Sequence, residues 1–186
     1  MSDEVHNDPN SKGIAADMEL LHQLEGEAYW KQLKTITERK EFKPVEKGIF
    51  SALGRDNADY DNLMAVSRKM IKRGYVVFIL PNPERIPSAD LILVRKGVYK
   101  MYDVKTITGT NSVSHRLEES KKQSKRVILH FQVSYNPRKL NQEISSYFKS
   151  SDNALEVVVI HGNKVLSLLR AGKTDKLWKR LCDLFR

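Results

Sequence analysis

Short apolar runs alternate with helix-like stretches from residue 57 onward, and their order restricts the fold more than any other feature of this sequence. The runs are short, rich in β-branched residues and bounded by Pro or Gly, which is typical of buried strands. The expected helices are 59–73, 111–123, 138–149 and one that begins after Thr174, and the expected strands are 75–80, 89–94, 100–107, 126–133, 155–160 and 164–169. A core of helix, three strands, helix and strand, extended by a C-terminal hairpin and helices, predicts an α/β (α+β) fold.

The N-terminal part of the chain shows weaker patterns. Residues 1–13 are polar and are expected to form a disordered tail. Residues 15–33 place leucines near helical spacing, although Gly26 interrupts them. Residues 34–56 are charged and mixed, so we expect a connector with a short helical turn around Phe50. The expected division is a disordered tail plus a helical N-terminal extension over 1–56, followed by a folded domain over 57–186.

Composition excludes several classes of protein. The 186 residues suit about one domain, and no apolar run approaches the ~20 residues that a membrane-spanning helix needs. The N-terminus has no basic start and no apolar core, so a secretory signal is not expected. Cys182 is the one cysteine of the sequence, which excludes a disulfide framework and a metal site built from several cysteines.

The positive charge of the chain is concentrated in one region. The net charge is +9, and residues 95–139 contain eleven basic residues but three acidic ones. Such a stretch favours binding to the phosphates of a nucleic acid, while an anionic membrane surface and an acidic protein are alternatives. The candidate nucleic-acid-binding residues are Arg95, Lys96, Lys100, Lys121, Lys122, Lys125 and Arg126.

Two carboxylates and a lysine lie where neighbouring strands are expected. Side chains alternate along a strand, so Asp103 and Lys105 share one face of the 100–107 strand. Pairing of this strand with the preceding one would bring Asp90 to the same end of the sheet. Two carboxylates suit Mg²⁺, and a lysine beside them can stabilise charge on a phosphate. An exposed Asp–Lys pair on a sheet face is the simpler alternative.

The helix expected next is unusually polar. Arg116, Ser120 and Gln123 lie at i, i+4 and i+7 and therefore share one face, which can point toward the same carboxylates. A solvent-exposed polar face is the alternative. The candidate supporting residues are Asp61, Thr106, Asn111, His115, Arg116 and Gln123.

Several short motifs between Gly74 and Arg170 occur in an order that resembles a known family. The motifs are Gly74-Tyr75, Ser88-Ala89-Asp90, Asp103-Val104-Lys105-Thr106, Asn111-Ser112, Arg116-Leu117, Lys122-Gln123-Ser124, Val127-Ile128-Leu129, Val157-Val158-Val159-Ile160 and Gly162-Asn163-Lys164-Val165. Together they resemble the C-terminal tRNase toxin domain of contact-dependent inhibition (CdiA-type) proteins, which is also found at the ends of phage head-morphogenesis proteins. Their order is similar, too, to that of the broader PD-(D/E)XK nuclease superfamily.

The resemblance implies a PD-(D/E)XK-like core over residues 57–186 and an endonuclease that cuts RNA, with tRNA as the substrate of the resembled toxins. It implies Asp90 and Asp103 as ligands of Mg²⁺ or another divalent cation, and Lys105 as the catalytic base or stabiliser. Related domains carry an acid on the helix before the first strand, where this chain offers Asp59 and Asp61. The resemblance also implies a cognate immunity protein, delivery within a secreted or phage-borne protein, and action in the cytoplasm without a membrane anchor.

Two other functions fit the same residues. A metal-independent ribonuclease of the barnase, EndoU or RelE type would use His115, Arg116 and Lys105 on the ribose 2′-hydroxyl and the developing phosphorane charge. A non-catalytic nucleic-acid-binding module would keep the fold and the basic surface without cleavage. Sensitivity to a chelator separates the first alternative from metal-dependent cleavage.

Overall fold

The computed structural model describes residues 13–83, 87–111, 113–172 and 177–186. Within these ranges, six helices surround one mixed sheet of eight strands. The helices are α1 (Ile14–Leu21), α2 (Gly26–Thr37), α3 (Tyr60–Ile71), α4 (Ser114–Ser120), α5 (Pro137–Ser150) and α6 (Leu177–Leu184). The strands are β1 (Lys43–Glu46), β2 (Ile49–Ser51), β3 (Val76–Ile79), β4 (Leu91–Arg95), β5 (Val98–Ile107), β6 (Arg126–Phe131), β7 (Glu156–His161) and β8 (Lys164–Leu169).

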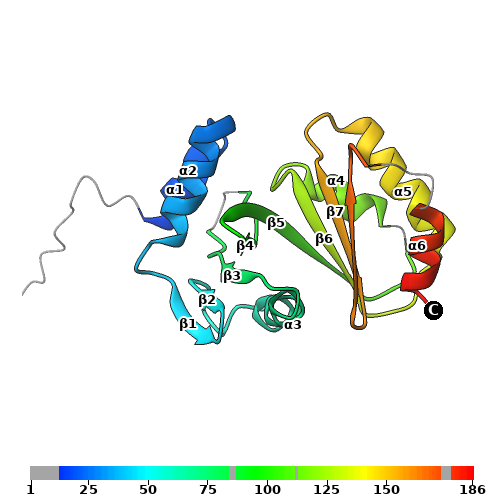
Figure 1. The fold of residues 1–186 in the computed structure, drawn as a ribbon, viewed down its shortest axis with the longest axis horizontal. Coiled ribbons are helices and arrows are strands. Elements are labelled where there is room, and N and C mark those ends of the chain that lie inside the picture. The colour runs from blue at the N-terminus through cyan, green and yellow to red at the C-terminus, as the bar shows by residue number, and fades with distance from the viewer. Residues whose placement is uncertain (1–12, 84–86, 112, 173–176) are drawn as a thin grey trace, which may run out of the picture.

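The expected α+β class is confirmed, and the strands lie side by side in chain order. Figure 1 shows α1 and α2 at one end of the molecule and α5 and α6 at the other. The β7–β8 hairpin turns at Gly162-Asn163 as expected, and Gly162 has a φ of +56°, a conformation that suits glycine. No helix of the described ranges is long and apolar enough to cross a bilayer.

Strand β5 joins the two halves of the sheet. Its first part, Val98–Tyr102, pairs antiparallel with β4, and its second part, Asp103–Ile107, pairs parallel with β6. The two neighbours occupy opposite edges of β5. The edge of β5 that pairs with β4 up to Tyr102 therefore has no strand partner from Asp103 onward among the described residues. This open edge is where the candidate site forms.

Apolar side chains are buried on both faces of the sheet, which explains why its strands are almost continuously apolar in sequence. In β4, Leu91 and Leu93 pack with α3 on one face, whereas Ile92 faces α1 and α2 on the other. This alternation follows from the period of two residues in a strand. Helices α5 and α6 cover the half of the sheet formed by β6, β7 and β8. The helices thus hold β5 from both sides.

The expected connector over residues 34–56 is wrong. Helix α2 continues to Thr37, and β1 and β2 then extend the sheet, with β2 parallel to β3. Phe50 lies in β2 and not in a helical turn, and its ring stacks on Phe78 at a centroid distance of 5.1 Å. Strand β2 has three residues, of which two are apolar, and so short a pattern cannot be distinguished from a loop in the sequence. Pairing with β3 determines the conformation of these residues.

Two expected helices differ in length from those observed. The single helix expected over 15–33 is two helices, because Gly26 adopts a φ of +57° at the break between α1 and α2. The helix expected over 111–123 is confined to α4, since residues 121–123 form turns. The expected helix start at Thr174 lies outside the described residues, and so does the tail expected over 1–13 except for Gly13.

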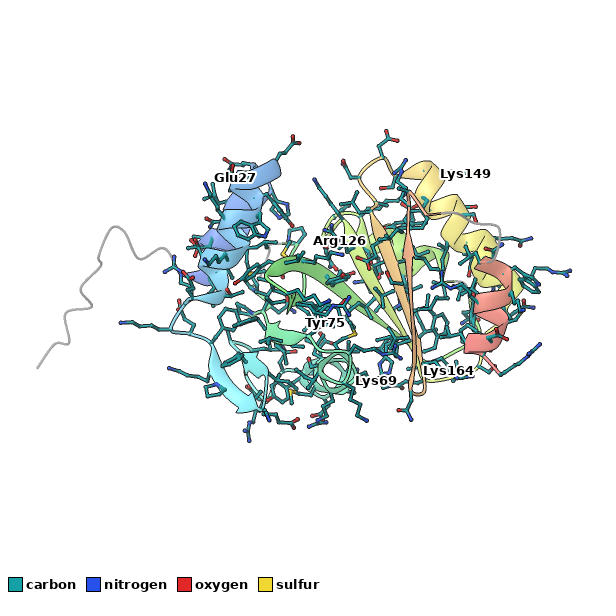
Figure 2. The ribbon with its side chains drawn as sticks, viewed as in Figure 1. Glu27, Lys69, Tyr75, Arg126, Lys149 and Lys164 are labelled. Carbon is teal, nitrogen blue, oxygen red and sulfur yellow. The ribbon has the colours of Figure 1, made fainter. Side chains whose placement is uncertain are left out.

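His130 on β6 provides a test of the fold. Its ring is buried, and the Nζ atom of Lys69 on α3 lies 3.0 Å from its Nε2 atom (Figure 2 labels Lys69). Burial and, to a smaller extent, the charge of Lys69 lower the pKa of His130 to about 4. Between about pH 6.5 and 4, His130 is therefore protonated in the unfolded chain but neutral in the folded chain.

We expect folding stability to fall as the pH drops through this window, and His130→Gln to reduce that fall by about 1–3 kcal/mol. Above about pH 6.5 the ring is neutral in both states, so the contribution of His130 no longer changes with pH. Urea denaturation of both proteins across this pH range measures the effect. Parallel stability curves for the two proteins would contradict the assignment of a buried, neutral His130.

Candidate functional site

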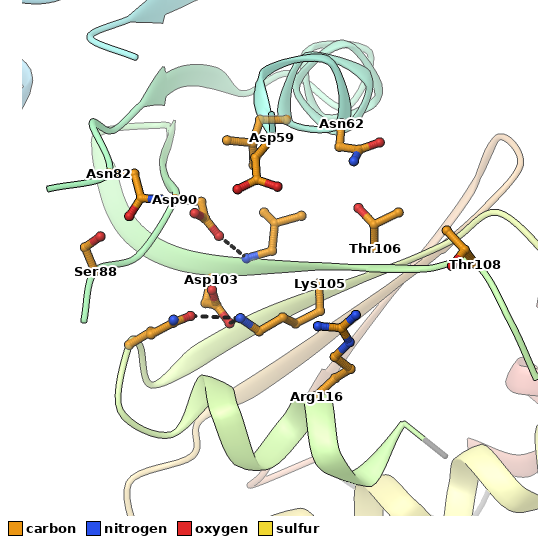
Figure 3. A pocket seen from close by; sticks show the side chains of 13 residues that line it. Asp59, Asn62, Asn82, Ser88, Asp90, Asp103, Lys105, Thr106, Thr108 and Arg116 are labelled. Atoms are coloured by element: carbon orange, nitrogen blue, oxygen red, sulfur yellow. Dashed lines mark hydrogen bonds and ion pairs between the residues drawn. The ribbon is translucent and has the colours of Figure 1, made fainter. Parts of the chain in front are cut away.

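A polar cavity of about 400 Å³ lies at the open edge of β5. Its lining comes from α3, the segments flanking β4, β5 itself, and α4 with the turn that follows it. Figure 3 shows Asp59 and Asn62 on one side of β5 and Lys105 and Arg116 on the other. The ionisable side chains that line the cavity are Asp59, Asp90, Asp103, Lys105 and Arg116.

Asp90 takes the place of the missing strand partner. Its backbone N–H donates to the carbonyl of Tyr102 at 2.9 Å, just before β4 begins. Its Oδ2 atom then accepts a hydrogen bond from the backbone N–H of Val104 at 2.7 Å. The side chain thus satisfies a backbone donor at the first unpaired position of β5. This contact anchors the Asp90 carboxylate at the edge of the cavity (Figure 3).

Asp103 and Lys105 contact each other, as their shared face predicts. Asp103 is 1% exposed, and its Oδ2 atom lies 3.2 Å from the Nζ atom of Lys105. The hydroxyl of Ser120 donates to the same Oδ2 atom at 2.5 Å. Lys105 in turn donates to Oε1 of Gln123 at 3.0 Å. Both charged groups are therefore oriented by polar side chains of α4 and its following turn.

The two carboxylates repel each other. Burial raises the pKa of Asp90 well above its usual range, and the negative charge of Asp103 raises it further. The hydrogen bond from Val104 and the charge of Lys105 act in the opposite direction and are smaller. A positive ion between Asp90 and Asp103 would relieve this repulsion.

The donor set fits a hard cation that keeps several waters. Mg²⁺ is commonly bound through one or two carboxylates, with water or substrate phosphate completing its octahedron. Asp90 and Asp103 offer two such carboxylates. No group of three or more His, Cys, Asp or Glu side chains suited to a metal occurs in the described part of the chain. The site therefore does not resemble a structural zinc centre, which uses four protein ligands.

Glu143 on α5 fixes the start of α4. Its Oε1 atom accepts a hydrogen bond from the backbone N–H of Val113 at 3.1 Å, directly before the helix. The hydroxyl of Tyr135 donates to the other carboxylate oxygen at 2.8 Å. A carboxylate at a helix N-terminus satisfies a free N–H group and interacts well with the helix dipole. Glu143 thereby positions the helix that presents Arg116 to the cavity and Ser120 to the carboxylate of Asp103.

The structure brings together most, but not all, of the candidate residues. Asp90, Asp103, Lys105, Thr106, Arg116 and Gln123 all line the one cavity. Asp61 does not, because it lies two residues after Asp59 and so points to a different side of the chain, into a separate cavity with Arg68. Asp59 lines the candidate site instead.

His115 and Asn111 also lie away from the cavity lining. His115 precedes Arg116 by one residue, so it projects from another face of α4. Its side chain is 80% exposed and contacts Glu119 at 3.0 Å. The backbone carbonyl of Asn111 lies 3.2 Å from the hydroxyl of Tyr135, next to Glu143 and away from the cavity lining.

Sequence reasoning missed several lining residues. Ser120 does not line the cavity itself, and although its spacing placed it on the face of Arg116, its hydrogen bond to Asp103 had no sequence signal. The cavity contains further polar residues from the first turn of α3 and from the loops next to the strands, and single polar residues at such positions give no sequence pattern. These additional residues are Asn62, Asn82, Ser88 and Thr108.

The candidate basic residues divide into two groups by their position in the fold. Lys100 and Arg126 lie 3.8 and 3.4 Å from the buried carboxylate of Glu156. Arg95 lies over the ring of Tyr75, and Lys96 occupies the β4–β5 turn. These four side chains therefore have structural roles or turn positions. The remaining three, Lys121, Lys122 and Lys125, follow α4 and line a second cavity.

The fold and site define an α+β protein with paired carboxylates and a lysine at an open strand edge. Residues 96–165 match the model of a family described as the contact-dependent growth inhibition CdiA C-terminal domain. The match runs from the β4–β5 turn into β8 and includes Asp103 and Lys105, while Asp90 lies before it. It covers less than half of the chain. The comparisons with curated proteins and with solved structures found no match.

Proposed function

We propose that this chain is a toxin domain that cleaves RNA in a reaction that depends on a divalent cation. Among RNAs, we propose tRNA as its substrate. The observation that carries the proposal is the convergence of Asp90, Asp103 and Lys105 on one cavity at the open edge of β5. The similarity of residues 96–165 to a CdiA C-terminal domain supports the toxin function. The order of Asp90, Asp103 and Lys105 along the chain resembles that of PD-(D/E)XK nucleases, and we propose this superfamily for the domain.

Asp90 and Asp103 are the proposed ligands of Mg²⁺. Mg²⁺ bound there would supply a Lewis acid for a phosphoryl oxygen and lower the pKa of a bound water. The chain holds each carboxylate in place independently, Asp90 through the N–H of Val104 and Asp103 through Ser120. Such preorganisation avoids the cost of orienting the ligands during the reaction.

Lys105 is the proposed stabiliser of the developing charge. An ammonium group has three N–H donors, and Asp103 and Gln123 accept two of them. The third is available to a phosphate oxygen or to the attacking water. Arg116 of α4, which lies on the same side of β5 as Lys105, offers a second cationic group for the phosphate, since guanidinium donors match phosphate oxygens well.

A cognate immunity protein is the proposed protein partner. The partner is expected from the similarity to contact-dependent inhibition toxins. We propose that the domain is delivered as part of a secreted or phage-borne protein and acts in the cytoplasm of the target cell. The positive charge of the chain favours an acidic partner surface, with binding that weakens as salt increases.

The test is incubation of wild type and Asp103→Ala with total RNA and, separately, with DNA. Each mixture is divided between Mg²⁺ and EDTA, and the fragments are sized. We expect discrete RNA fragments, dominated by cleaved tRNA, for the wild type in Mg²⁺ alone. Cleavage that persists in EDTA would favour the metal-independent alternative, and equal cleavage by Asp103→Ala would remove the proposed site.

A further inference from the structure

A second polar cavity, of about 320 Å³, adjoins the candidate active site. Its walls are the turn between α1 and α2 and the segment that follows α4. Gln123 lines both cavities and forms the boundary between them. A volume of this size falls within the range of about 300–1,000 Å³ that is usual for ligand sites. A polymer held at Lys105 could therefore continue past Gln123 into the second cavity.

The second cavity is lined by positively charged side chains, two of which form no ion pair with a described carboxylate. Lys121, Lys122 and Lys125 line it, opposed by Glu25 on the other wall. Lys121 is engaged with Glu118 at 2.5 Å. Lys122 and Lys125 are exposed, and neither forms an ion pair with a described carboxylate. Free ammonium groups beside a cavity are suited to phosphate groups, whose binding releases counterions.

An aromatic ring lies beside these lysines. Tyr29 of α2 lines the cavity and is partly buried, and the Nζ atom of Lys125 lies 5.9 Å from the centroid of its ring. Helix α2 is held against the sheet by buried Leu33 and by an edge contact between Trp30 and Tyr99 at 5.8 Å. The ring is therefore supported by a fixed element. Grooves for single-stranded nucleic acids combine cations with such aromatic platforms.

We propose that this second cavity is a subsite for the single-stranded RNA next to the cleaved bond. Lys122 and Lys125 bind backbone phosphates there, and Tyr29 stacks on an unpaired base. The proposal rests on the proposed ribonuclease function and extends it. It assigns the N-terminal helices α1 and α2, which lie outside the 96–165 match, to substrate binding.

The first test compares wild type with Lys122→Ala/Lys125→Ala. The control is Lys149→Ala/Lys179→Ala, which removes the same charge from α5 and α6 (Figure 2 labels Lys149). The kcat/KM is measured on an RNA of about 20 nucleotides and on a fragment of about four that spans the cleaved bond, because the fragment is too short to fill both cavities. We expect about a tenfold loss for the Lys122/Lys125 variant on the long RNA and none on the fragment.

The control variant should cleave both RNAs as wild type does. Unchanged cleavage of the long RNA by Lys122→Ala/Lys125→Ala would overturn the subsite. An equal loss on both lengths would overturn it as well, because the two lysines would then act within the first cavity. A loss of the same size in the control would indicate that only net charge matters, which also contradicts the proposal.

RNA binding separates failure of the subsite from failure of the nuclease. Fluorescence anisotropy with the long RNA is recorded over a series of salt concentrations. We expect the slope of log affinity against log salt to be shallower in the Lys122/Lys125 variant by about 1.4, from about 0.7 per phosphate contact. If the two proteins differ in slope by this amount but wild type cuts no RNA, the subsite proposal is supported and the nuclease proposal is wrong. If wild type does not bind RNA, the subsite is wrong.

Tyr29 variants test the stacking contact. Tyr29→Phe keeps an aromatic face, whereas Tyr29→Leu keeps an apolar side chain without one. We expect Tyr29→Leu to weaken binding of the long RNA about tenfold and Tyr29→Phe to leave it within about twofold. Equal affinity of both variants and wild type would exclude stacking at this position, and an equal loss in both would assign the contribution to the hydroxyl.

Discussion

Lys105→Ala is expected to lower the kcat for RNA cleavage by about 10²–10³-fold, with a much smaller change in KM. The ammonium group lies inside the cavity, 14% exposed, and is oriented by Asp103 and Gln123 toward the place where a phosphate would react. Removing one preorganised donor from a site that stabilises transition-state charge has an effect of this size. Steady-state kinetics on the RNA that wild type cuts provides the measurement.

Two controls accompany the Lys105 variant. Lys47→Ala removes one positive charge from the exposed turn between β1 and β2 and should leave kcat unchanged. Circular dichroism should show an intact fold for Lys105→Ala, because Ser120 still donates to Asp103. Wild-type kcat in a folded Lys105→Ala protein would show that the ammonium group takes no part in catalysis.

Asp90→Asn is expected to abolish cleavage while stabilising the fold in metal-free buffer. The amide oxygen of asparagine can still accept the hydrogen bond from Val104, so the edge of β5 remains satisfied. Burial and, next, the charge of Asp103 raise the pKa of Asp90 to about 8 in the folded chain, so folding at neutral pH costs free energy that an uncharged asparagine does not cost. The substitution also removes a charged ligand for the proposed cation, and we expect activity to fall by about 10³-fold.

Thermal unfolding in EDTA and cleavage assays in Mg²⁺ measure the two effects of Asp90→Asn separately. A higher Tm together with lost cleavage is the expected pair of results, since active sites commonly reduce stability. Ser88→Ala, which alters another residue of the same cavity, is the matched control and should change the Tm without a comparable loss of cleavage. A lower Tm for Asp90→Asn would mean that the burial of the Asp90 carboxyl group beside Asp103 does not reduce the stability of the fold.

The contrast between Asp59 and Asp61 shows where sequence reasoning ends. Both are acids near the start of α3, and their spacing alone does not indicate which of them faces the sheet. The packing of Tyr60, Leu63 and Met64 against the strands sets the rotation of the helix. That rotation brings Asp59 to the cavity and directs Asp61 toward Arg68.

The pairing of Asp90 with Asp103 was predictable for a different reason. A tight turn at Lys96-Gly97 joins β4 and β5, and it fixes Leu91 opposite Tyr102. The residues just beyond this pair are Asp90 and Asp103. Short hairpins determine their own register, so local sequence was sufficient here. The small strands β1 and β2 had no such local partner, and their sequence did not reveal them.

By itself, the sequence determined the order of the elements from residue 57 onward, the shared face of Asp103 and Lys105, and the register that brings Asp90 close to them. These features depend on backbone periodicity and short turns, which act between residues near in the chain. The tertiary structure alone decided that Ser120 binds Asp103, that Asp59 enters the cavity, and that Tyr29 lies beside Lys125. Those contacts join distant segments, whose relative placement follows from packing of the whole core.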